Sequence, residues 1–343
     1  ALKFLLFSLA GGLIMLASVI GLYGVSSANG QPSYLLSDLA KLNLNTDLGK
    51  WLMAGFLIAF VIKAPMVPLH TWLPDAAEQS TPGTATMLVG ILDKIGTFGM
   101  IKFCLGIFPD ASRWAAPVMM VLALVSIIWG ALGAIGSRNL MRLVAYTSIS
   151  HFGFMVLGIY AMTTTSIAGS AFYMLNHGFS TAALFLVVGY LIKRSGTADI
   201  DAFGGAQKLV PVFSGVFLLA WLSALGLPGM SSFVSEFMVL AGTFGRAPVH
   251  AGVAAIGVIL SAVYALRVYR SVMTGPVTDA SASHFTGRDL SGLEKAIMVP
   301  IIGVLLVLGF YPAPAVTLVQ STAVVAMQRV AVADPAPVVE GVK

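Results

Sequence analysis

Charge is scarce in this sequence. Only 10% of its 343 residues are Asp, Glu, Lys or Arg, whereas 58% are hydrophobic and the mean hydropathy is +0.92. A soluble domain carries roughly 25% charged residues, because polar side chains must cover its apolar core. The composition therefore excludes an ordinary water-soluble domain and predicts an all-α polytopic membrane protein.

Cysteine is nearly absent, and the common nucleotide and metal motifs are absent as well. The single Cys104 excludes a disulfide framework, and it also excludes iron–sulfur clusters and multi-thiolate zinc sites, which need several thiolates. The sequence contains no G-x-G-x-x-G, P-loop, H-E-x-x-H or C-x-x-C pattern. Its net charge of +5 is scattered rather than clustered, which argues against nucleic-acid binding. We therefore predict no cofactor and no metal site within this chain.

Long apolar runs are abundant, and they predict nine membrane helices in one bundle over residues 1–318. A span needs about 20 apolar residues. The tail at 319–343 contains Pro335 and Pro337 and no long apolar stretch after Arg329, so we expect a weakly ordered surface extension there. The predicted spans are residues 4–26, 49–69, 82–107, 115–136, 143–163, 166–192, 210–242, 249–272 and 295–318.

Basic residues are unequally shared between the two ends of these spans. The poorer end receives Lys41, Lys50, Arg113 and Arg246, and by the positive-inside rule the richer end is cytoplasmic. This predicts a multi-pass protein of the bacterial plasma membrane with its C-terminus outside. Because an apolar run begins just after Ala1 and many spans follow, we expect a truncated polytopic chain rather than a signal peptide. The richer end receives Arg138, Arg142, Lys193, Arg194, Lys208, Arg270, Arg288 and Lys295.

Three ionisable residues lie inside apolar runs: Lys63, Lys94 and Glu236. Each costs about 2.5 to 3.5 kcal/mol at the centre of a membrane helix, so each is a candidate functional residue. The structural alternatives are lysines that extend toward the membrane surface, or a static buried ion pair. A glutamate has a short stem, and Lys94 lies some twelve residues into its span, so the first alternative fits Lys63 best.

Helix breakers accompany two of these charges. Pro65 and Pro68 follow Lys63, and a Gly226, Pro228, Gly229 cluster precedes Glu236. Proline removes a backbone donor, which is tolerated at membrane depth where the backbone lines a hydrated cavity. Two interrupted helices, each beside a charge, are typical of inverted-repeat transporters. Packing kinks are the alternative reading.

Two histidines, His151 and His177, lie inside apolar spans among hydroxyl and amide side chains. A neutral imidazole can accept a proton on one nitrogen and release one from the other, so the pair could relay protons between charged groups. Each could instead be a packing residue with satisfied hydrogen bonds. Metal ligation is disfavoured, because no His or carboxylate lies three or four residues after either one. Asp93 does not pair directly with Lys94, since consecutive helical residues point about 100° apart.

Three segments carry a resemblance to a known family. They are VIKAPMVPLHTWLPDAAEQSTPGTATMLVGILDKIGTFG, RNLMRLVAYTSISHFGFMVLGI and LGLPGMSSFVSEFMVL. Together they resemble the antiporter-like membrane subunits of respiratory complex I, NADH:quinone oxidoreductase, in the superfamily of the Mrp antiporters. The resemblance extends from residue 1 to about residue 270. A glutamate at position 236 is typical of the NuoM type rather than of the NuoL, NuoN and Mrp antiporter types.

The resemblance implies an arrangement of repeats. A full-length member has fourteen helices with two inverted five-helix repeats, each containing one broken helix. The nine helices here would then be the sixth to the fourteenth. Residues 1–107 would end the first repeat, 115–272 would form the second, and 295–318 would be the last helix.

The resemblance also implies roles for residues. Lys63 would be the lysine of the first broken helix, Lys94 the central lysine and Glu236 the distal residue of the second repeat, with His151 and His177 between the two half-channels. In that family the glutamate partner of Lys63 belongs to a preceding helix that this sequence lacks. Asp93 stands where an apolar residue is expected.

The implied function is proton translocation by a membrane-arm subunit of the oxidoreductase, without redox chemistry in this chain. FMN, iron–sulfur clusters and quinone would belong to partner subunits, and the neighbours would be antiporter-like subunits of the NuoL and NuoN types within the lipid bilayer. The alternatives are a subunit of an Mrp-type Na⁺/H⁺ antiporter and a membrane subunit of a hydrogenase or formate hydrogenlyase. A structural scaffold that carries no protons is a further alternative, and it predicts that neutralising Lys94 or Glu236 leaves pumping intact.

Overall fold

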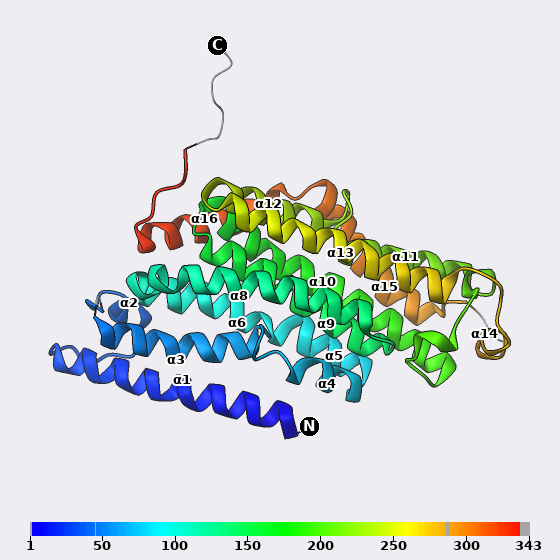
Figure 1. The fold of residues 1–343 in the computed structure, drawn as a ribbon, viewed down its shortest axis with the longest axis horizontal. Coiled ribbons are helices and arrows are strands. Elements are labelled where there is room, and N and C mark those ends of the chain that lie inside the picture. The colour runs from blue at the N-terminus through cyan, green and yellow to red at the C-terminus, as the bar shows by residue number, and fades with distance from the viewer. Residues whose placement is uncertain (1, 45, 286–288, 337–343) are drawn as a thin grey trace, which may run out of the picture.

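The computed structural model describes residues 2–44, 46–285 and 289–336. In these ranges the regular secondary structure is helical, apart from one isolated bridge between Asn139 and Asp199. The helices lie side by side, with α1 (Leu2–Ala28) at one edge and α13 (Pro248–Met273) near the opposite edge (Figure 1). The predicted all-α membrane architecture is confirmed. Arg288 and the tail residues 337–343 lie outside the described residues.

Six helices within the described ranges are long and apolar enough to cross a membrane by length and composition. Local signals set their ends. The longest begins with a capping box of Thr163 and Ser166 and ends at Gly196, whose φ of +74° lies in the left-handed region that favours glycine. The six are α1, α8 (Pro109–Gly136), α9 (Leu140–Tyr160), α10 (Thr164–Ser195), α13 and α15 (Gly292–Phe310), and all but α15 match a predicted span to within about six residues at each end.

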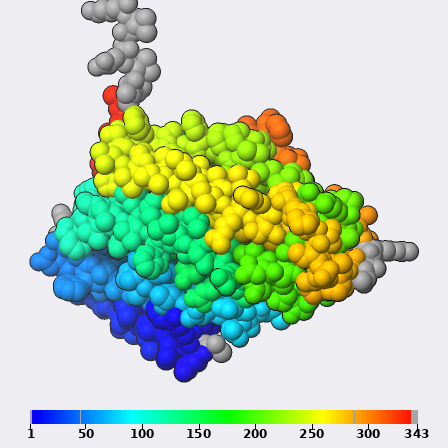
Figure 2. Space-filling view, turned by 45° about the vertical axis from the view of Figure 1, so that its right-hand side comes forward, coloured from blue at the N-terminus to red at the C-terminus, as the bar shows by residue number. Residues whose placement is uncertain are grey.

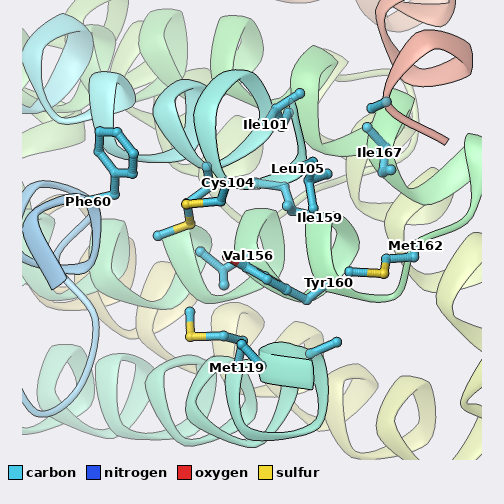
Figure 3. Packing of buried hydrophobic residues seen from close by; sticks show 14 of the residues in the cluster. Phe60, Ile101, Cys104, Leu105, Met119, Val156, Ile159, Tyr160, Met162 and Ile167 are labelled. Atoms are coloured by element: carbon cyan, nitrogen blue, oxygen red, sulfur yellow. The ribbon is translucent and has the colours of Figure 1, made fainter. Parts of the chain in front are cut away.

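The central helix is α9, in which nearly every residue is buried. Figure 3 shows part of the core around its Tyr160, where Cys104, Met119 and Val156 come together from three different segments. The outer helices instead expose large apolar side chains, such as Ile259 of α13. Figure 2 shows α13 (yellow) lying across one face of the molecule. Apolar surface on this scale indicates contact with lipid.

The predicted span 82–107 is a helix of alternating geometry. Two wide turns of π-helix, η1 (Leu88–Leu92) and η2 (Met100–Cys104), interrupt its α-helical parts. A π turn has i to i+5 hydrogen bonds, which redirect the side chains that follow it. The sequence does not predict these turns. The α-helical parts are α5 (Pro82–Met87), α6 (Lys94–Gly99) and α7 (Leu105–Ile107).

The first predicted break is present, but the helix before it ends earlier than predicted. Where the sequence predicts a span to residue 69, α3 (Asp47–Lys63) ends at Lys63 because Ala64 precedes a proline and leaves the helical region. The chain becomes helical again at α4 (Trp72–Gln79), which was not predicted. Protein groups satisfy the interrupted backbone: Trp72 Nε1 donates to the Ile62 carbonyl at 3.0 Å, and Ser126 Oγ accepts from Val67 N at 3.0 Å.

The second predicted break is confirmed. α11 (Pro211–Ala224) ends before the glycine and proline cluster, and α12 (Ser231–Arg246) begins after it. Ser261 Oγ donates to the Leu225 carbonyl at 3.2 Å, and Asn176 Nδ2 donates to the Ser231 carbonyl at 2.9 Å. The Leu225 carbonyl, which the break leaves without a helical partner, therefore binds a polar side chain, as membrane depth requires.

The prediction for the C-terminal region was wrong. Instead of one helix over 295–318 and a weakly ordered tail, α15 ends at Phe310 and a further helix, α16 (Ala313–Val330), follows. Its Ala323, Ala326, Met327 and Val330 recur at helical spacing and bury one face. The helix contains too few apolar residues for the sequence to predict a membrane span. Arg113 and Arg246 donate to the carbonyls of Val330 and Ala333, so this segment lies at the end of the bundle that holds these basic residues.

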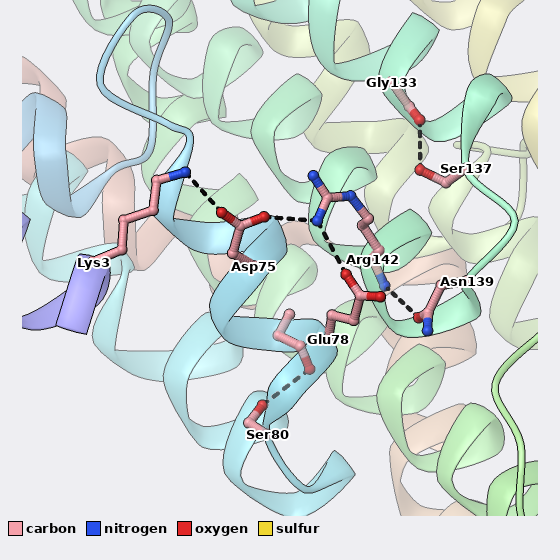
Figure 4. A network of polar contacts seen from close by, with 9 residues as sticks. Lys3, Asp75, Glu78, Ser80, Gly133, Ser137, Asn139 and Arg142 are labelled. Atoms are coloured by element: carbon pink, nitrogen blue, oxygen red, sulfur yellow. Dashed lines mark hydrogen bonds and ion pairs between the residues drawn. The ribbon is translucent and has the colours of Figure 1, made fainter. Parts of the chain in front are cut away.

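A polar network joins helices at the opposite end of the bundle. Asp75 of α4 binds Lys3 of α1 and Arg142 of α9, each at 2.7 Å, and Arg142 also binds Glu78 at 3.0 Å (Figure 4). The backbone of Arg142 is held as well, because the Asn139 side chain caps the start of α9. The network joins three helices at their ends, where water can solvate the charges.

Candidate functional site

Lys94 points into the bundle and binds a histidine of another helix. Its Nζ donates to the carbonyl of Val89, in the π turn before it, and lies 2.7 Å from His177 Nδ1 of α10. The residue is only 8% exposed. Lys94 therefore does not extend toward the membrane surface, which excludes one of the structural alternatives.

The two helices approach closely at this contact because both are glycine there. A Cβ added to Gly178 would lie 3.0 Å from the Gly90 carbonyl oxygen, and one added to Gly90 would lie 3.5 Å from that of Gly178. The flanking Lys94 and His177 can therefore meet directly.

The two predicted histidines form a pair. The rings of His151 and His177 have centroids 5.1 Å apart at 79°, and both residues are buried. His177 Nε2 lies 3.1 Å from Thr181 Oγ1, and His151 Nε2 lies 3.3 Å from the hydroxyl of Tyr264. Of the hydroxyls that the sequence places nearby, Thr181 contacts a histidine, whereas Ser148 and Ser150 donate to backbone carbonyls.

Glu236 lies at the second break, 4% exposed. The hydroxyl of Tyr173 donates a hydrogen bond to its Oε1. Its Oε2 fills the space beside Gly226, where an added Cβ would lie 2.2 Å away, and Gly226 has a φ of +71°. The break therefore makes room for the carboxylate.

Two tyrosines close the gap between the histidines and Glu236, and sequence reasoning missed both. The Tyr173 ring lies 5.8 Å from that of His151 and 6.3 Å from that of His177. The hydroxyl of Tyr264 in α13 contacts His151, and that of Tyr173 contacts Glu236. Tyr173 precedes His177 by four residues, so the two share a helix face, and that signal could have identified it. No local signal identifies Tyr264.

Lys63 is the one predicted residue outside this array. It is half-buried at the end of α3, where its Nζ lies 3.2 Å from Ser8 Oγ and 5.4 Å from the centroid of the Phe4 ring, both in α1. Among the described residues, none of Lys63, Lys94 and Glu236 has an oppositely charged group within 4.0 Å. A static ion pair therefore does not explain these buried charges.

The arrangement is an array of proton donors and acceptors through the core. It runs from Lys94 through His177 and His151 to Tyr173 and Tyr264, and ends at Glu236. Each member is a group that can bind a proton or donate a hydrogen bond, and all are buried. An array of this kind can carry protons, and it offers no nucleophile and base set for acyl or phosphoryl transfer.

Comparison with known proteins assigns the chain to a family. The profile of the family described as "NADH:quinone oxidoreductase/Mrp antiporter, TM" matches residues 1–263. The chain belongs to this family. Among its relatives, NADH-quinone oxidoreductase subunit M of Mycobacterium tuberculosis is 46% identical, over 98% of this chain and 62% of that protein. Subunit M of Pseudomonas aeruginosa is 37% identical, over 92% and 61%.

Solved structures agree. A chain of respiratory complex I from Thermus thermophilus superposes with a TM-score of 0.88 at 31% identity, covering 96% of this chain and 68% of that one. A chain of the Mrp complex from Dietzia sp. shares the fold, with a TM-score of 0.85 at 23% identity over 96% and 69%. The resemblance to complex I subunits of the M type is thereby confirmed. The chain spans about three fifths of the length of the curated relatives it matches.

Proposed function

We propose that this chain translocates protons as part of a membrane-arm subunit of NADH:quinone oxidoreductase. The observation that carries the proposal is the buried array from Lys94 to Glu236, in a chain of the M type of this family. Among the described residues, Lys94 and Glu236 have no ion-pair partner. Burying unpaired charges is costly, and a static scaffold would gain nothing from them.

Hydrogen-bond chemistry assigns a direction to each contact. A lysine ammonium has donors only, so while Lys94 is charged, His177 Nδ1 accepts and its Nε2–H donates to Thr181. When the ammonium proton moves to Nδ1, the Lys94 amine becomes the acceptor and His177 becomes a cation next to His151. The proton then passes from His177 to His151, which returns the first imidazole to its neutral form.

Glu236 receives the proton at the far end. His151 releases it through the Tyr264 hydroxyl or water, and the Glu236 carboxylate becomes a carboxylic acid. Its Oε1 still accepts the hydrogen bond from Tyr173. Moving a charge across 100 mV stores about 2.3 kcal/mol. In a buried array, adding or removing one charge changes the free energy of protonating the neighbouring group by an amount of similar size.

The proposal includes partners and location. Electrons would pass through FMN, iron–sulfur clusters and quinone in other subunits, because this sequence has one cysteine and no nucleotide motif. The neighbouring membrane subunits would be of the NuoL and NuoN types. The chain would span a bacterial plasma membrane, with the end that holds Arg113 and Arg246 outside.

The test is Lys94→Ala in the full-length subunit within its complex. The helix keeps its apolar faces and loses the central proton carrier, so we expect normal complex content with a lower ratio of protons moved to electrons transferred. Membrane vesicles that energise with NADH give that ratio. An unchanged ratio at normal complex content would contradict the proposal and favour a scaffold.

A control variant separates local damage from the loss of the proton carrier. Lys102→Ala changes a lysine of the same helical run that takes no part in the array, so its ratio should equal that of the wild type. Uptake of Na⁺ by the wild-type vesicles, rather than of protons alone, would favour the Mrp-type alternative.

A further inference from the structure

Asp93 is buried without a partner. It is 1% exposed, and within the described residues neither of its carboxylate oxygens has a hydrogen bond. It sits at the junction of η1 and α6, but its side chain does not cap α6. A carboxylate without partners is among the most costly groups to bury, so local structure gives no reason for it.

Asp93 lies on the face of its helix that is directed toward the first break. Asp93 lies three residues before Gly96, and residues at this spacing share a helix face. Gly96 packs directly on the end of α3: a Cβ added there would lie 2.4 Å from Ala64 N and 2.5 Å from the Phe60 carbonyl oxygen. Asp93 is therefore on the side of α6 that meets the break, whereas Lys94 points toward α10.

Two lysines flank this carboxylate. Lys94 follows Asp93 directly in the chain, and Lys63 directly precedes Ala64, on whose backbone Gly96 packs. Lys63 is the last residue of α3, and its present partner is a neutral hydroxyl, Ser8 Oγ at 3.2 Å. A cavity of about 120 Å³ between α1, α3 and α6 is lined by Lys63, Ser8 and Ile95. The cavity gives the long lysine side chain room to change its rotamer.

We propose that Asp93 is a proton-transfer residue that links Lys63 to Lys94. This inference rests on the proposed function and extends its array to the first break. In the first step the Lys63 ammonium gives a proton to the Asp93 carboxylate, leaving a neutral amine and a carboxylic acid. In the second step the acid gives its proton to the neutral Lys94 amine, which restores the carboxylate and forms the ammonium that faces His177. Each step moves one proton and conserves total charge.

The test compares three substitutions in the assembled complex. Asp93→Asn keeps the shape but cannot carry a proton, Asp93→Glu keeps the titrating group, and Asp93→Leu supplies the apolar residue that a purely structural position would favour. We expect Asn and Leu to lower the coupled quinone-reductase rate by about a hundredfold or more, the low end for loss of a positioned proton donor. Glu should recover most of the rate. Asp47→Asn, which removes an exposed carboxylate at the start of α3, is the matched control and should not change it.

Infrared difference spectra provide a measurement that would not change if Asp93 had only a structural role. Vesicles of the wild-type complex should show a carboxylic acid C=O band that changes on energisation and is missing in Asp93→Asn. Wild-type rates and pumping in Asn and Leu, at normal complex content, would overturn the inference. The two proposals fail differently: if Lys94→Ala blocks pumping but Asp93→Asn does not, only the role of Asp93 is refuted.

Discussion

The two broken helices differ in how firmly they hold their charged residues. At the second break Glu236 is fixed, because Tyr173 donates to one oxygen and Gly226 borders the other. At the first break Lys63 is half-buried, and its Nζ hydrogen-bonds to Ser8. At each break a side chain binds a freed backbone carbonyl, that of Ile62 at the first and that of Leu225 at the second. The difference between the breaks lies in how firmly the charge is held.

This difference indicates a division of roles. A proton acceptor at the end of an array benefits from a fixed position, since transfer requires donor and acceptor within about 3 Å. A residue that must collect a proton and pass it inward benefits from alternative rotamers, which a four-carbon lysine stem provides. We therefore expect pumping to be more sensitive to displacement of the charge at the second break than to displacement of the charge at the first break.

Glu236→Gln should have the largest effect at the second break. Glutamine preserves shape and can still bind Tyr173, but it cannot take a proton, so we expect nearly complete loss of pumping and coupled turnover. Glu236→Asp retains the titrating group on a shorter stem and should lose less. The rates are measured in vesicles normalised to complex content. Equal turnover of the wild type and the Gln variant would make Glu236 a hydrogen-bonding residue only.

Gly226→Ala tests whether the break itself fixes Glu236. The new Cβ would lie 2.2 Å from Oε2, and a left-handed conformation costs alanine about 1 to 2 kcal/mol. We expect the carboxylate to be displaced, with pumping lowered by about tenfold, the kinetic equivalent of about 1.4 kcal/mol. Gly215→Ala in α11 is the matched control, since a Cβ there meets nothing within 4 Å. If both variants pump like the wild type, the close fit at Gly226 has no role.

Sequence reasoning predicted the features that stand out chemically against an apolar background. Lys94 and Glu236 are charges in apolar runs, and the prolines and glycines beside the breaks act through their own backbone restrictions. Such features need no knowledge of neighbouring helices. The array also contains His151 and His177, which sequence placed in the right spans but could not orient.

The missed features depend on packing between distant segments. The π turn η1 determines where Lys94 points, and nothing local in that run distinguishes η1 or η2 from α-helix. Tyr264 becomes part of the array only because α13 packs beside α9. The helix α16 has too few apolar residues to predict a span, and it is stabilised by burying a face on the end of the bundle. Asp93 was recognised as unusual, yet its direction required the contact between Gly96 and α3.

The hydroxyls that bind the charge at each break separate the fixed residue from the mobile one, and we expect the smallest effect at Ser8. Tyr173→Phe removes a hydrogen bond to a buried carboxylate, worth about 1.5 to 3 kcal/mol, so pumping should fall about tenfold. Ser8→Ala removes one partner from a half-buried lysine with room to move, and should change the rate by about twofold or less, within about 0.5 kcal/mol. The comparison is made on coupled rates at equal complex content. A Ser8 variant as impaired as the Tyr173 variant would show that Lys63 also needs a fixed position, and the division of roles between the two breaks would not hold.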